Sequence, residues 1–104
     1  MYKIGYLFAS NHTDIHYVRQ PNRVDFRRRY DGNFSTDERL AKPIQDIDTA
    51  KALIIKIVDR FTKNDGYQYT PVLINTQTGW YQRYLNGHWL HECIDTPERK
   101  KAAV

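Results

Sequence analysis

Histidines and a cysteine are the side chains of this sequence best suited to bind a metal or to attack a substrate. The chain of 104 residues holds four histidines and one cysteine, and zinc sites are built from thiolate, imidazole and carboxylate ligands. His91 and Cys93 are two positions apart, so on a strand they would share one face. A third ligand would have to come from His12 or His16. These four residues define one hypothesis, a metal-dependent or thiol enzyme.

The spacing of these residues argues against an enzyme. His88 and His91 are three positions apart and would point to opposite faces of a strand, and neither zinc-finger spacing nor an HExxH pattern occurs. Alternate strand residues lie about 6 to 7 Å apart, too far for Cys93 and His91 to share a direct hydrogen bond. The five glycines form no phosphate-binding loop of the GxGxxG or P-loop kind. We therefore predict no catalytic residue and no cofactor, and keep the metal or thiol enzyme as the alternative.

Positive charge is concentrated in one short segment. The chain has 16 Lys and Arg against 12 Asp and Glu, a formal net charge of +4. Between positions 19 and 29 there are five arginines and one acid, Asp25, so the rest of the chain is neutral, with eleven charges of each sign. The arginines, followed by an aromatic residue, are Arg19, Arg23, Arg27, Arg28, Arg29 and Tyr30. This composition predicts an acidic partner, either nucleic acid or a nucleic-acid-handling protein.

A β-ribbon is the element that we expect to present these arginines. Ile15–Gln20 and Arg23–Tyr30 flank a short connection at Pro21, and this register pairs Tyr17 with Phe26. Apolar residues then occupy one face of the ribbon and arginines the other. Such a ribbon fits the major groove of DNA, where arginines contact phosphates or guanine. The same arginines are also compatible with a solvated strand edge that blocks unwanted pairing.

One strand and one helix form the framework of the first two thirds. Tyr2–Ala9 alternates in the manner of a strand, and turn formers at positions 10–14 predict that the chain then reverses. A helix is predicted from Thr49 to Lys63, with Asp48 as its N-cap. Its apolar stripe comprises Ala50, Leu53, Ile54, Ile57, Val58 and Phe61.

The last third is predicted to be a meander of three strands, at positions 68–75, 80–85 and 88–94. Asn86 and Gly87 form the clearest hairpin signal, because both residues tolerate positive φ. This turn pairs Leu85 with His88 and Trp80 with Cys93. We expect the face that carries Trp80, Gln82, Tyr84, Trp89, His91 and Cys93 to lie under the helix.

The sequence as a whole predicts one α+β domain over residues 1–104, with a basic tail at 96–104. An antiparallel sheet, made of the N-terminal hairpin and the C-terminal meander, should carry the main helix on one face. A single cysteine excludes an internal disulfide, and no apolar segment approaches the roughly 20 residues of a membrane span, so we expect a cytoplasmic protein. A small, basic, motif-poor chain is typical of phage or mobile-element inhibitors of host defence machinery. The expected function is non-catalytic binding.

Overall fold

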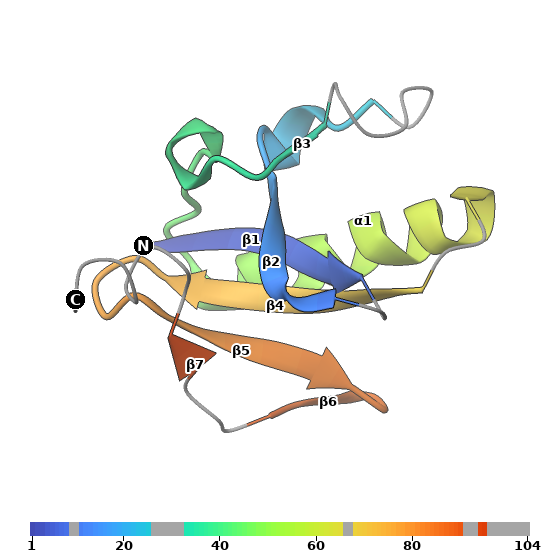
Figure 1. Ribbon diagram of the computed structural model, residues 1–104. Helices are drawn as coiled ribbons and strands as arrows, with labels where there is room; N and C mark the ends of the chain where they lie inside the picture. Colours follow the sequence, from blue (N-terminus) through green and yellow to red (C-terminus); the bar gives the residue numbers. More distant parts are fainter. Residues whose placement is uncertain (9–10, 26–32, 66–67, 91–93, 96–104) are drawn as a thin grey trace.

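An antiparallel sheet and one long helix make up the fold (Figure 1). The computed structural model describes residues 1–8, 11–25, 33–65, 68–90 and 94–95, with the backbone alone at positions 8, 11–14, 64–65 and 94–95. The strands are β1 (Tyr2–Phe8), β2 (Asn11–Val18), β3 (Phe34–Ser35), β4 (Tyr69–Asn75), β5 (Trp80–Leu85), β6 (His88–Trp89) and β7 (Ile94–Asp95). Two 3-10 helices, η1 (Pro21–Arg23) and η2 (Glu38–Leu40), precede the helix α1 (Ile47–Asp65). The predicted α+β class is confirmed.

Strand β1 lies in the middle of the sheet. Within the described residues the strand order is β3-β2-β1-β4-β5-β6, and β7 also pairs with β5. All of β1 pairs with β4, from Tyr2 opposite Asn75 to Phe8 opposite Tyr69. On its other side β1 pairs with β2, where Gly5 lies opposite Tyr17. The chain therefore reverses after β1 as predicted, but β2 begins at Asn11, within the positions 10–14 that were expected to form the turn. Strand β1 brings this hairpin against the C-terminal part of the chain.

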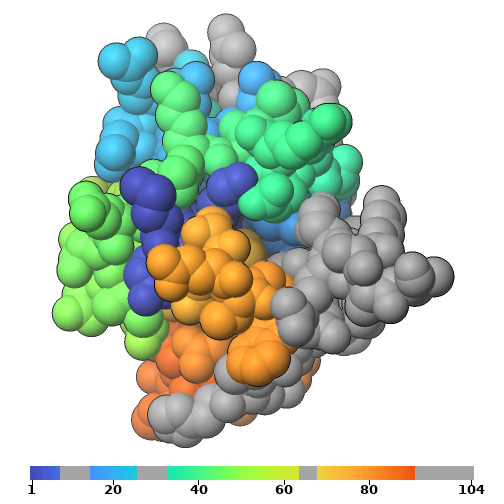
Figure 2. Space-filling model, turned by 90° about the vertical axis from the view of Figure 1, so that its left-hand side faces the viewer, coloured from blue at the N-terminus to red at the C-terminus, as the bar shows by residue number. Residues whose placement is uncertain are grey.

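Several segments distant in sequence meet at one end of the sheet, which Figure 2 views end-on. The carbonyl of Met1 accepts hydrogen bonds from the backbone N–H of Thr76, at 3.1 Å, and from its hydroxyl, at 2.8 Å. Tyr2 and Ile44 exchange two backbone hydrogen bonds of 2.7 and 2.6 Å. The start of β1, the turn between β4 and β5 and the segment before α1 are thus fixed to one another.

Helix α1 (Ile47–Asp65) extends two residues beyond the predicted Thr49–Lys63 at each end. Asp46, rather than Asp48, is its N-cap: the Asp46 carboxylate accepts hydrogen bonds from the backbone N–H of Thr49, at 2.8 Å, and from its hydroxyl, at 2.7 Å. The first backbone bond of the helix runs from Ala50 N–H to the Asp46 carbonyl, at 3.0 Å. Both aspartates precede the apolar stripe, so the pattern alone did not decide between them.

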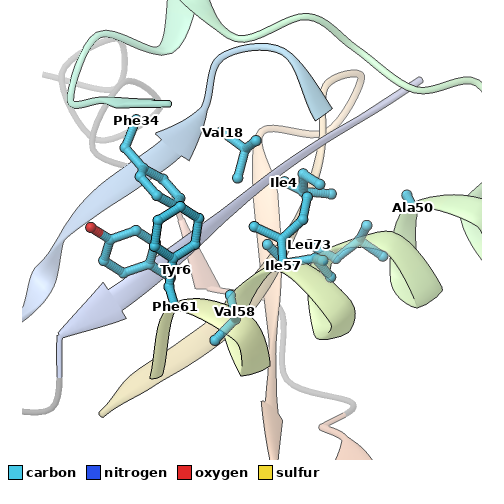
Figure 3. Packing of buried hydrophobic residues seen from close by; sticks show 10 residues of the cluster. Ile4, Tyr6, Val18, Phe34, Ala50, Ile57, Val58, Phe61 and Leu73 are labelled. Carbon is cyan, nitrogen blue, oxygen red and sulfur yellow. The ribbon is translucent and has the colours of Figure 1, made fainter. Parts of the chain in front are cut away.

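The apolar stripe of α1 packs on one face of the sheet, as predicted (Figure 3). Ile4 and Tyr6 of β1 point towards this helix-covered face, and Phe34 from β3 packs edge-on against both Tyr6 and Phe61. Leu53 is only partly buried. The buried members of this cluster are Ile4, Tyr6, Val18, Phe34, Ala50, Ile54, Ile57, Val58, Phe61 and Leu73.

The opposite face of the sheet is also buried, and this changes the expected burial of β5 but not its orientation. A second cluster consists of Leu7, Ile15, Tyr17, Ala41, Val72, Ile74 and Tyr81. Gln82 lies opposite Leu73, so Trp80 and Gln82 are on the helix-covered face, as predicted. Tyr81 lies opposite Ile74 on the other face, where it is 5% exposed, whereas Trp80, expected in the core, is 39% exposed. When both faces of a sheet bury apolar residues, alternation alone does not show which residues are buried.

The predicted ribbon between Ile15 and Tyr30 is wrong where the structure describes it. Strand β2 ends at Val18, and Pro21 begins the 3-10 helix η1 instead of a two-residue hairpin turn. Proline suits this position because it needs no backbone N–H at a helix start. Tyr17 pairs with Ser35, not with Phe26. Residues 26–32 lie outside the described residues.

The C-terminal hairpin is confirmed at its turn and differs further along. Asn86 and Gly87 have φ of 51° and 80°, and Leu85 pairs with His88. Trp80 pairs with Asp95 rather than with Cys93, so the register shifts by two positions between β6 and β7. Residues 91–93 and the expected tail at 96–104 lie outside the described residues.

Gly5 gives the first testable prediction, because β2 passes very close to it. A Cβ atom at this position would lie 2.7 Å from the backbone oxygen of His16. Gly5→Ala should therefore lower the free energy of unfolding by about 1–3 kcal/mol, the usual cost of overpacking. Urea denaturation measures this difference, and an unchanged midpoint would contradict the close approach.

Asp46 gives a prediction about pH. Hydrogen bonds from the Thr49 hydroxyl and backbone N–H lower the pKa of Asp46 below its ordinary 3.8. The folded state therefore gains stability above the unfolded pKa and loses it as the pH falls through the lower folded pKa. Asp46→Ala should reduce the melting temperature at neutral pH, and the difference from wild type should shrink below pH 3.8. Asp46→Asn, which keeps a cap without a charge, should remove most of this pH dependence.

Candidate basic surface

The structure describes the side chains of two of the four histidines, His16 and His88, and these two do not form a metal site. The ring of His16 stacks on Tyr6, with centroids 5.1 Å apart and planes 12° apart. His88 is exposed beside the β5–β6 turn. No three His, Cys, Asp or Glu side chains among the described residues are grouped to hold a metal. His91 and Cys93 lie outside the described residues, as does the side chain of His12, so the prediction for them stays a prediction.

Arg19 joins two segments that the sequence did not connect. Its backbone N–H donates to the carbonyl of Asn33, at 2.9 Å, and its carbonyl accepts from the backbone N–H of Lys42, also at 2.9 Å. Arg23 follows at the end of η1, where its N–H donates to the carbonyl of Gln20. The fold thereby brings Lys42 next to two of the predicted arginines. Arg27, Arg28, Arg29 and Tyr30 lie outside the described residues.

A groove separates η1 from the segment 42–44, and we call it the basic groove. It has a volume of about 230 Å³ and is lined by residues 20–23 and 42–44. Arg23 and Lys42 are both exposed, and neither side chain forms an ion pair with a described residue. No acidic residue lines the groove. Pro21 and Pro43 stand in its two walls, where their fixed φ limits backbone motion. The groove therefore presents two cations on a stiff backbone.

The Asn33 side chain holds the backbone at Asp25, two residues after η1, in place. Asn33 is buried at 4% exposure and pairs with both backbone groups of Asp25. The Asn33 Oδ1 accepts from the Asp25 N–H at 2.9 Å, and Nδ2 donates to the Asp25 carbonyl at 2.7 Å. The clamping role of Asn33 depends on a partner eight positions away, which no local motif reveals.

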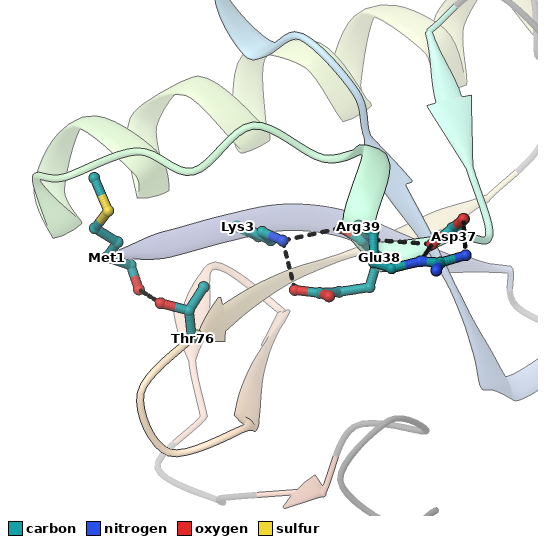
Figure 4. Close-up of polar contacts among 6 residues, drawn as sticks. All are labelled: Met1, Lys3, Asp37, Glu38, Arg39 and Thr76. Carbon is teal, nitrogen blue, oxygen red and sulfur yellow. Dashed lines mark hydrogen bonds and ion pairs between the residues drawn. The ribbon is translucent and has the colours of Figure 1, made fainter.

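Two other cations, Arg39 and Lys3, form ion pairs with carboxylates at η2 (Figure 4). Arg39 Nε and Nη2 lie 3.1 and 3.0 Å from the carboxylate oxygens of Asp37, and these hydrogen bonds lower the pKa of that carboxyl group. Lys3 Nζ lies 2.6 Å from the Glu38 carboxylate and donates to the Glu38 carbonyl at 3.0 Å. Only 13% of the Lys3 side chain is exposed. These two cations fix η2 in place, in contrast to Arg23 and Lys42.

A second, smaller cavity lies on the other side of the Tyr2–Ile44 pair, and we call it the aromatic pocket. It has a volume of about 170 Å³, and its lining includes Tyr2, Ile47, Leu73, Asn75, Trp80 and Gln82. No charged residue lines it. Neither Lys42 nor an accessible Trp80 was predicted, because the sequence pattern favoured Trp80 in the core and concentrates positive charge at positions 19–29.

A third groove of about 370 Å³ runs between the C-terminal half of α1 and strands β4 and β5. Apolar residues such as Ile55 and uncharged polar residues line it, together with one acid, Asp59. Asp59 pairs with Lys63 at 3.5 Å. Because no basic residue lines this groove, it does not suit an acidic partner.

Comparisons of the chain with protein families, with curated proteins and with solved structures find no match in any of the three. No helix in the described part of the chain is long and apolar enough to cross a membrane.

Asn33→Ala tests whether the two hydrogen bonds between the Asn33 side chain and the Asp25 backbone support the region around the basic groove. The variant leaves the Asp25 N–H and carbonyl without their partners, which should cost about 1–3 kcal/mol of unfolding free energy. Asn22→Ala, at an exposed position of η1, is the matched control and should change stability by less than about 0.5 kcal/mol. Equal urea midpoints for the two variants would show that the clamp is dispensable.

Proposed function

We propose that this protein is a non-catalytic binding protein whose basic groove engages an acidic macromolecule. The partner is nucleic acid or the acidic face of a nucleic-acid-handling protein, such as a host defence nuclease. One observation carries the proposal: Arg23 and Lys42 face the same groove, from segments joined through Arg19, and no acid lines it.

The distribution of charge supports this proposal. The net charge of +4 arises in the segment that contains Arg19 and Arg23, and the fold adds Lys42 to it. Side chains that neutralise phosphates release condensed counterions, which favours binding at low salt. Because Pro21, Pro43 and the Arg19 backbone bonds hold the groove walls, little backbone freedom has to be lost on binding.

Arg23→Ala combined with Lys42→Ala tests the proposal. The double variant should elute from a heparin column at lower salt than wild type, because two contacts to the polyanion are lost. The matched control is Lys56→Ala with Lys63→Ala, which removes two exposed charges from α1. Both double variants lower the net charge from +4 to +2. Elution of the two at the same salt would overturn the proposal, since only total charge would then matter.

A salt titration separates the two kinds of partner. If the partner is nucleic acid, log Kd should depend steeply on log salt between about 50 and 200 mM. Loss of two phosphate contacts should then reduce the slope by about 1.4 to 1.8. A protein interface with a desolvated aromatic centre should respond much less to salt.

A further inference from the structure

We propose that the partner is single-stranded nucleic acid, with phosphates in the basic groove and one unpaired base in the aromatic pocket. This inference rests on the proposed function and names the partner class. It follows from the position of the two cavities on either side of one pair of residues, Tyr2 and Ile44.

The aromatic pocket has the chemistry that an unpaired base requires. Trp80 is 39% exposed there and Tyr2 lines the same cavity, so aromatic surface is accessible for stacking. Ile47 and Leu73 add apolar surface. The Gln82 amide makes no hydrogen bond to a described residue, so it can donate to or accept from the edge of a base.

The size of the pocket favours one flat ring system. Its volume of about 170 Å³ is below the roughly 300–1,000 Å³ of sites for drug-sized ligands. A base in a duplex is stacked and paired, so it would have to leave the helix to enter, at a cost of a few kcal/mol. An unpaired base avoids most of this cost, and single strands are therefore favoured over duplex.

The two cavities are linked through one pair of residues, so we infer that one strand occupies both. Ile44 lines the basic groove and Tyr2 lines the aromatic pocket, and these residues are joined by backbone hydrogen bonds of 2.7 and 2.6 Å. Figure 2 looks onto this end of the molecule, where η1, the start of β1 and the β4–β5 turn share one surface. Cations beside an exposed aromatic residue are the combination by which proteins hold single strands.

Fluorescence anisotropy with a labelled oligothymidylate of about 16 nucleotides tests this inference. Trp80→Leu keeps apolar surface but removes stacking, and should weaken binding about 5- to 150-fold, the range for loss of one base–aromatic stack. Trp80→Phe keeps an aromatic face and should restore most of the affinity. Neither substitution should change the salt at which the protein elutes from heparin, because no charge is altered.

The failure of this inference is distinguishable from the failure of the proposed function. Suppose that Arg23→Ala with Lys42→Ala weakens heparin binding, while Trp80→Leu binds the oligothymidylate as wild type does. The basic groove would then stand and the base-binding pocket would be wrong. A labelled duplex of the same length that binds as tightly as the single strand, or an oligothymidylate that does not bind at all, would also overturn the pocket. Circular dichroism of each variant confirms that the fold is intact.

Discussion

The packing of β1 is the constraint on which the rest of the structure depends. This strand pairs on both sides, and it buries Ile4 and Tyr6 against the helix and Leu7 on the opposite face. Lys3 lies on that opposite face and is largely shielded from water, so its charge needs a partner. Glu38 is this partner, and the pair attaches η2 to the sheet. The partly buried Lys3 thus helps to position the segment that carries Lys42 and Ile44.

Backbone contacts, rather than side chains, build the surface around the two cavities. Arg19 joins Asn33 and Lys42, and Tyr2 joins Ile44, entirely through N–H and carbonyl groups. Any residue other than proline can make such bonds, so the fold leaves the exposed side chains of Arg23 and Lys42 free for recognition. Arg39 and Lys3 differ, because Asp37 and Glu38 neutralise their charges.

Local patterns predicted the fold class well and the candidate site poorly. The helical stripe of α1, the strand at β5 and the Asn86 turn each depend on residues close in sequence, and each is confirmed. The ribbon failed because Pro21 starts a 3-10 helix and β2 takes its partner from β3. The predicted face of Trp80 is correct, but its predicted burial is wrong, because the buried residue of this pair is Tyr81 on the opposite face. Lys42 and Asn33 act through partners distant in sequence, for which a single sequence carries no signal.

The order in which β1 finds its two neighbours also bears on how the chain folds during synthesis. Strand β2 follows β1 directly, but Tyr2 pairs with Asn75, which is 73 positions later (75 minus 2). Pairings this distant close large loops and are typical of slower folding. Until β4 leaves the ribosome, α1 has only half of its sheet platform, and the apolar surface of the early hairpin stays exposed to water. Closure of β1 against β4 therefore requires that residues as far as Asn75 have left the ribosome.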